Sequence, residues 1–196
     1  MPRDIEKKED TQVSNHKSFR RSSLALSLLA FAFAVTTVCW AQTSKDSKEV
    51  SGLLSDVKTE AVQLRHDADE MKSFTHSTLT WQSHAAKVEE MKRHVNNAGK
   101  LLTKLDNAKG AASPWQQQAI DQITPMLKEL ASNVTSTIEH LNQRPKLLHT
   151  GPYADYVSAN YELASNLAEL ISDYVDYGKS KARSDELAAR LEVPGN

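Results

Sequence analysis

The residue in this chain whose type and position best suit it to chemistry is His84. It stands in a run of apolar residues with helical spacing, between Trp81 and Val88. A histidine enclosed by helices can ligate a metal ion or haem, or exchange a proton near neutral pH. The simpler interpretation, which we prefer, is a histidine near the end of a helical bundle that packs against Trp81 and hydrogen-bonds locally.

Two further histidines are candidate partners for His84 in a metal or haem site. His94 follows Met91 by three residues and Glu90 by four, which places these side chains on one helical face. One helix supplies too few ligands for a metal ion, so we interpret His94 as part of a solvated face. His140 lies on a later predicted helix. A metal- or haem-binding bundle that uses His84 with His94 or His140 is therefore our alternative functional hypothesis.

Several other kinds of chemistry are excluded by the sequence. No histidine has Glu three residues before it, so the Glu-x-x-His pairs of di-iron bundles are absent. The one cysteine, Cys39, lies in a hydrophobic segment, which leaves the rest of the chain without disulfides or Cys-ligated metals. No serine has the glycine pattern of a nucleophile elbow. We therefore assign no catalytic, cofactor-binding or metal-binding residue, and we expect a non-enzymatic protein without a cofactor.

The N-terminal region is typical of a targeting segment. Basic residues at 17–21 precede an uncharged apolar run from Leu24 to Val38, and small residues at Cys39 and Ala41 precede Gln42. This order of features predicts a signal peptide. The run is short for a membrane-spanning helix, which needs about 20 residues, but a retained anchor over residues 22–41 is the alternative. Either outcome places the following domain on the far side of a membrane, periplasmic or extracellular.

Residues 42–196 are predicted to form one all-helical domain after a charged region at 1–21 and the signal or anchor at 22–41. Helices are expected at about 46–73, 80–109, 114–143 and 152–191. Apolar residues recur at alternating steps of three and four, the spacing of a heptad seam. The predicted seam positions are Val50, Leu54, Val57, Ala61, Leu64, Ala68 and Met71; Trp81, His84, Val88, Met91, Val95, Ala98, Leu102 and Leu105; Ile120, Ile123, Leu127, Leu130, Val134, Thr137 and Leu141; Tyr153, Val157, Asn160, Ala164, Leu167, Ile171 and Tyr174.

Local signals mark where these helices begin and end. Ser113, Pro114 and Gln116 predict a capped start with a capping box. Pro125 is expected to kink the third helix and Gly178 to weaken the fourth. All five tyrosines lie on the fourth helix, which we expect to be the most enclosed. Their rings are expected to pack while their hydroxyls stay in water. The alternative is a tyrosine-lined groove for a peptide or a small ligand.

Short connections between helices of matched length favour an up-down-up-down antiparallel four-helix bundle. The alternative is an extended coiled coil that dimerises through one broad face. Acidic and basic residues are interspersed, with a net charge of about -3 from Gln42 onward. No basic stripe suitable for nucleic acid is present. The sequence therefore favours an exported bundle that binds an unknown protein partner, itself or the cell envelope, with membrane contact only through residues 22–41.

Overall fold

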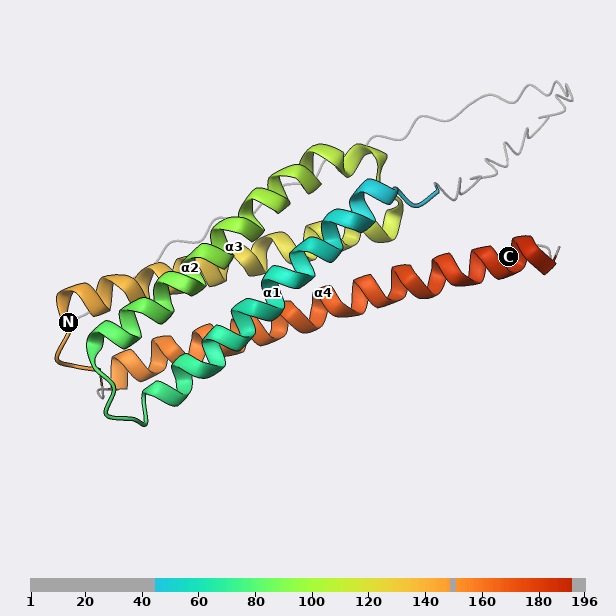
Figure 1. Ribbon diagram of the computed structural model, residues 1–196. Coiled ribbons are helices and arrows are strands. Elements are labelled where there is room, and N and C mark those ends of the chain that lie inside the picture. Colours follow the sequence, from blue (N-terminus) through green and yellow to red (C-terminus); the bar gives the residue numbers. More distant parts are fainter. Residues whose placement is uncertain (1–44, 149–150, 192–196) are drawn as a thin grey trace, which may run out of the picture. The chain divides into compact units, whose positions relative to one another are not determined.

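The computed structural model describes residues 45–148 and 151–191, whose regular secondary structure is entirely helical (Figure 1). The four α-helices are α1 (Lys48–Phe74), α2 (Trp81–Ala108), α3 (Pro114–Gln143) and α4 (Gly151–Leu191), and a short 3-10 helix, η1 (Lys109–Ala111), follows α2. Over these residues the prediction of an all-α fold without strands is confirmed. The predicted signal or anchor segment, residues 22–41, lies outside the described residues.

The helices pack as a bundle in which each has two main neighbours. Helix α1 lies against α2 and α4, and α3 lies against the same two helices. Figure 1 shows that successive helices run in alternating directions. The connections are short. Residues 75–80 lie between α1 and α2 in the sequence, and residues 144–150 lie between α3 and α4. No helix of the described residues has an apolar stretch long enough to cross a bilayer.

The core follows the predicted seams of α1 to α3 closely. Every predicted seam position of α1 and α3 is buried, and so is every one of α2 except Trp81. Trp81 is 42% exposed, and the prediction that it belongs to the seam is wrong. It is the first residue of α2, where the ends of the neighbouring helices leave a large side chain uncovered.

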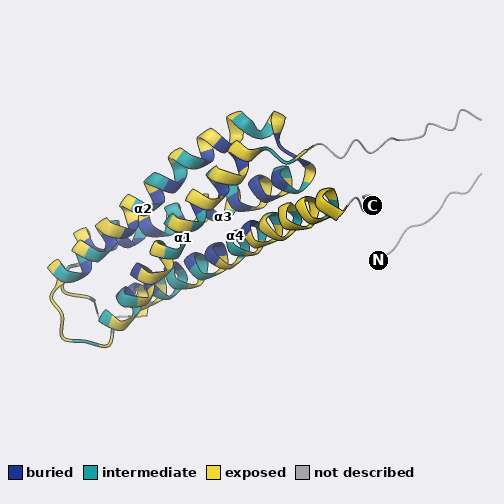
Figure 2. Ribbon diagram, turned by 45° about the vertical axis from the view of Figure 1, so that its right-hand side comes forward, coloured by how far each residue is buried: buried dark blue, intermediate teal, exposed yellow. Residues whose placement is uncertain are grey.

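Helix α4 is not the most enclosed helix, contrary to expectation. It is 41 residues long, compared with 27 to 30 for the other three, and its last buried residue is Val175. Its final turns extend past the ends of the neighbouring helices and are exposed (Figure 2). Helix α3 has more buried positions, because it is covered along its whole length.

Gln116 ties the start of α1 to the start of α3. Its Oε1 accepts hydrogen bonds from the backbone N–H groups of Ser47 and Ser113, each at 3.0 Å. Its Nε2 donates to the Ser47 carbonyl and to Ser51 Oγ, each at 2.9 Å. The bond to Ser113 is the Gln116 half of the predicted capping box. The other three bonds join helices that are far apart in sequence.

Gly178 lets Trp115 pack closely on α4. A Cβ at Gly178 would lie 2.7 Å from Trp115 Cη2, which is closer than real contacts allow. The Trp115 indole N–H donates to Asp46 Oδ1 at 2.7 Å, and Lys181 Nζ lies 3.6 Å from the other oxygen of Asp46. Gly178 therefore marks a close approach of helices, and α4 continues through it to Leu191.

Candidate functional site

His84 is fully buried at one end of the bundle, in contact with aromatic residues. Its Nδ1 lies 2.8 Å from the Tyr153 hydroxyl on α4. Its ring also makes edge contacts with Phe74 and Tyr153, with centroids 5.6 and 5.4 Å away. These two rings, rather than the predicted Trp81, surround His84. Since Nδ1 is hydrogen-bonded to the hydroxyl, a metal ion at this nitrogen would have to displace Tyr153.

His140 lies on α3 against the same tyrosine. Its ring centroid is 5.7 Å from that of Tyr153 and 5.8 Å from that of Tyr156. Burial raises the pKa of Tyr153, so its hydroxyl stays protonated, contrary to the expectation that the tyrosine hydroxyls are wet. The structure thus brings His84 and His140 to one buried tyrosine. Sequence reasoning missed Tyr153 as their common neighbour, because its position on the seam indicated only burial.

His94 lies in a different environment from the other two candidates. It is ten residues after His84 on the same helix, about 15 Å along the axis. Its Nδ1 lies 2.6 Å from Glu60 Oε2, and its Nε2 lies 3.6 Å from Asp67 Oδ2. The expectation of a solvated face is wrong, because this half-buried ring is held between two carboxylates of α1. Each ring nitrogen therefore faces a carboxylate of its own.

Lys87 extends this polar contact between α1 and α2. Its Nζ lies 2.5 Å from a carboxylate oxygen of both Glu70 and Glu90, and 3.4 Å from Asp67 Oδ1. Burial disfavours the charged lysine, but the hydrogen bonds to Glu70 and Glu90 and the nearby Asp67 outweigh it and raise its pKa. In turn, the hydrogen bonds from Lys87 lower the pKa values of Glu70 and Glu90. These ion pairs give the charged residues between α1 and α2 a structural role in holding the two helices together.

The candidate ligands do not come together as a metal centre in the described residues. Across residues 45–148 and 151–191, no group of three His, Cys, Asp or Glu side chains is placed to hold a metal ion. His84 and His140 share an aromatic neighbour, and His94 lies with Glu60 and Asp67. The arrangement suits hydrogen bonding and packing between helices.

Another polar residue of the seam, Asn160, also joins helices. Its Nδ2 donates to Thr137 Oγ1 at 2.9 Å, and its Oδ1 accepts from Asn133 Nδ2 at 2.8 Å. Asn133 also donates to the Tyr156 carbonyl at 3.0 Å. Such a buried polar contact fixes the register of two helices.

A surface feature that the seams did not predict is a groove between α3 and α4. Two adjoining cavities of about 660 and 370 Å³ form it, and they share Leu170 and Asp173. We call it the α3/α4 groove. Its larger part is lined by Asp121, Gln122, Pro125, Met126, Asn166, Glu169, Leu170 and Asp173, and its smaller part by Trp115, Gln118, Leu170, Asp173, Tyr174 and Tyr177.

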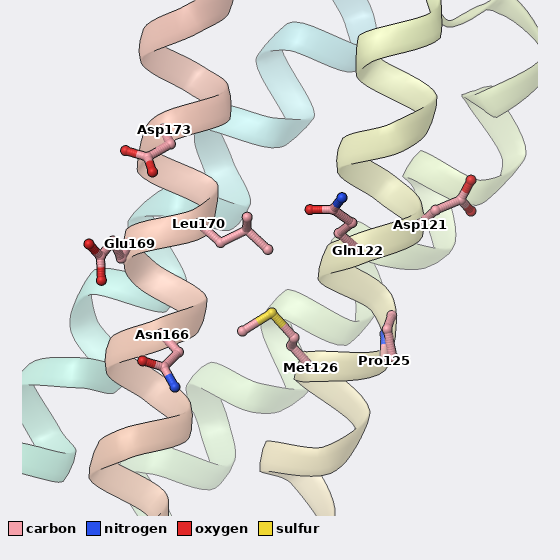
Figure 3. A pocket seen from close by; sticks show the side chains of 8 residues that line it. All are labelled: Asp121, Gln122, Pro125, Met126, Asn166, Glu169, Leu170 and Asp173. Carbon is pink, nitrogen blue, oxygen red and sulfur yellow. The ribbon is translucent and has the colours of Figure 1, made fainter.

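The groove has an apolar floor and acidic flanks. Figure 3 shows Leu170 and Met126 pointing toward one another between the helices, with the carboxylates of Asp121, Glu169 and Asp173 on the outer sides. Asp121 forms an ion pair with Lys109. Glu169 and Asp173 are exposed and have no ion-pair partner among the described residues. Apolar surface beside uncompensated negative charge favours a basic, amphipathic partner.

The acidic character of the groove extends along most of α4. Between Gly151 and Gly178 the helix has five acidic residues and no lysine or arginine. These acidic residues are Asp155, Glu162, Glu169, Asp173 and Asp176. Of the aromatic residues at the end of the groove, Tyr177 is 53% exposed and stands edge-on to Trp115, with ring centroids 5.4 Å apart.

Comparisons with protein-family models, curated proteins and solved structures found no match to this chain.

Proposed function

We propose that this chain is an exported, non-enzymatic helical protein that binds another protein through the α3/α4 groove. In this proposal a signal peptide, or a retained anchor at residues 22–41, delivers an up-down-up-down antiparallel bundle to the periplasm, the envelope or the exterior. The observation that supports protein binding is the groove itself, with apolar residues between acidic flanks.

The chemistry of the groove favours an amphipathic helix as the bound element. Leu170 and Met126 offer an apolar strip between two nearly parallel helix axes, a geometry that accepts a third helix. Glu169 and Asp173 are one helical turn apart, so basic residues one turn apart on the partner can meet both. Electrostatic attraction would speed association and make it sensitive to salt.

The histidines are better explained as internal contacts than as ligands of a metal or haem. His84 is hydrogen-bonded to Tyr153, and His94 faces Glu60 and Asp67. A metal ion bound at His84 Nδ1 would have to displace the Tyr153 hydroxyl. The alternative of a cofactor at His84 with His94 or His140 therefore gains no support from the geometry of the described residues.

A defined peptide can test whether the groove binds a helix. The probe is a synthetic helical peptide with leucines at i and i+4 and arginines on both flanks of that strip. In residues 42–196 with Trp81→Phe, Trp115 is the one remaining tryptophan and lies in the groove. We expect the emission of Trp115 to change saturably on titration, and the affinity to fall as salt is added.

Charge-matched variants distinguish the groove from general attraction to an acidic protein. Glu169→Lys with Asp173→Lys should weaken peptide binding at least tenfold. Asp56→Lys with Asp69→Lys makes the same change in charge at exposed positions of α1 and should leave binding within about twofold, the level expected for unrelated surface sites. A peptide of the same composition with its leucines spread around the helix should not bind. Equal weakening by both double variants would contradict a role for the groove.

Export is tested separately from binding. The mature protein is expected to begin at Gln42 and to be found outside the cytoplasm, as shown by N-terminal sequencing after cell fractionation. An intact N-terminus in the membrane fraction would favour the anchor. The full-length chain in the cytoplasm as a soluble protein would contradict export in either form.

A further inference from the structure

The end of α4 has properties opposite to those of the groove. Between residues 179 and 191 it has four basic residues, Lys179, Lys181, Arg183 and Arg190, and two acidic ones. None of these thirteen residues is buried. Leu187 and Leu191, one helical turn apart, are 37% and 63% exposed. We call residues 179–191 the α4 extension. It is a basic amphipathic helix, and among the described residues its Lys181 forms an ion pair with Asp46 at the start of the bundle.

The leucines of the α4 extension lie in line with the acidic flank that α4 gives to the groove. Leu187 follows Glu169 by eighteen residues, and Leu191 follows Asp173 by eighteen. Eighteen residues make five full turns of an α-helix. The acidic flank and the exposed leucines therefore lie along one line of a single helix, the flank before Gly178 and the leucines after it.

We propose that the α4 extension of a second copy of this chain occupies the α3/α4 groove, and that two copies exchange these extensions around a two-fold axis near Gly178. This proposal rests on the proposed function of the groove and names its occupant. In such an arrangement the two α4 helices run antiparallel, and a residue beyond Gly178 lies opposite one that precedes Gly178 by the same number of positions.

The lengths and charges of the two elements agree with this arrangement. The α4 extension is about 20 Å long, and the part of α4 that lines the groove, from Asn166 to Tyr177, is about 17 Å long. Arg183 falls opposite Asp173 of the second copy, five residues from the axis on each side. Leu187 falls opposite Glu169 and next to Leu170, and Arg190 falls opposite Asn166, three residues from Glu169. A symmetric dimer makes each contact twice.

Charge reversal on either side of the contact provides a direct test. The mass of residues 42–196 in solution is measured by sedimentation equilibrium over a range of concentrations. The wild type is expected to be a dimer. Glu169→Lys with Asp173→Lys, and separately Arg183→Glu with Arg190→Glu, should each raise the dissociation constant at least tenfold. The Asp56→Lys and Asp69→Lys variant changes the same number of acidic residues on α1 and should remain a dimer.

Mixing the two disrupted variants distinguishes a specific exchange from a loss of folding. In the mixed pair every reversed groove meets a reversed extension, and every natural groove meets a natural extension. The mixture is therefore expected to dimerise although neither variant does so alone. If the mixture fails to dimerise, the exchange is overturned. It is also overturned if each variant alone dimerises with the wild-type dissociation constant.

The experiments test dimerisation through the α4 extension separately from peptide binding by the groove. A wild type that is monomeric at every concentration overturns the exchange of extensions. If the same monomer binds the synthetic basic peptide, the groove remains a docking site with a different protein as its partner. If it binds neither, both proposals fail.

Discussion

Replacing His84 tests whether this buried histidine serves the fold or a cofactor. Its Nδ1 and the Tyr153 hydroxyl are 2.8 Å apart, and both side chains are fully buried. His84→Leu removes one partner and leaves the hydroxyl without it in an apolar surrounding. An unsatisfied buried polar group costs about 1–3 kcal/mol. Tyr153→Phe leaves Nδ1 without the hydroxyl and is expected to cost an amount in the same range.

The double variant is expected to be more stable than the sum of the single changes implies. When both partners are replaced by apolar groups, no polar atom of this pair is left buried without the other, so part of the cost disappears. We expect a coupling energy of about 1–2 kcal/mol from a double-mutant cycle. The assay is urea unfolding of residues 42–196 followed by far-ultraviolet circular dichroism. Additive single effects, with coupling below about 0.5 kcal/mol, would refute the hydrogen bond as a source of stability.

The same variants examine the cofactor alternative. A ligand at a concentration of 100 times its dissociation constant stabilises the folded state by about 2.7 kcal/mol. If His84 only packs and hydrogen-bonds, the melting temperature should not change when zinc, copper or haem is added. A rise in the wild type that is lost in His84→Leu would instead make His84 a ligand.

Three further predictions concern the fold and its pH dependence. Gly178→Ala should destabilise the protein by about 1–3 kcal/mol through the clash with Trp115, whereas Gly52→Ala, which meets open space, should stabilise it by up to about 1 kcal/mol; urea unfolding measures both. Leu64→Ala should cost about 2–5 kcal/mol in the same assay, because the side chain is fully buried. Lys87 lowers the pKa of two glutamates below 4.5, so its ion pairs stabilise the protein above that pH and are lost in acid. Lys87→Met should therefore flatten the fall in unfolding free energy between about pH 5 and pH 3.

The sequence predicted the core well because seam periodicity is a local property. Leu64 and Leu130 are recognised from neighbours three and four residues away, and both are fully buried. Trp81 has the same spacing but lies at a helix end, where periodicity does not show whether another helix covers it. The excess length of α4 was visible, but its consequence was not, since burial beyond Val175 depends on where the other helices end.

The polar contacts could not be predicted from the sequence, because the two partners of each contact are far apart in the chain. His84 meets Tyr153, and Gln116 meets Ser47, across 69 residues in each case. The capping box of Gln116 concealed its second role at the start of α1. His94 was assigned to solvent from its own helix alone, although Glu60 comes from the neighbouring helix. The α3/α4 groove likewise depends on the spacing between two helices.

The most direct test of the groove as the interaction surface uses the methionines as reporters. Residues 42–196 contain Met71 and Met91, both fully buried, and Met126, which lines the groove. The protein is labelled with carbon-13 at the methionine methyl groups, and its resonances are followed as the basic amphipathic peptide is added. The Met126 resonance is expected to shift or broaden while those of Met71 and Met91 stay in place. An unchanged Met126 resonance at peptide concentrations that saturate binding would contradict the proposed surface.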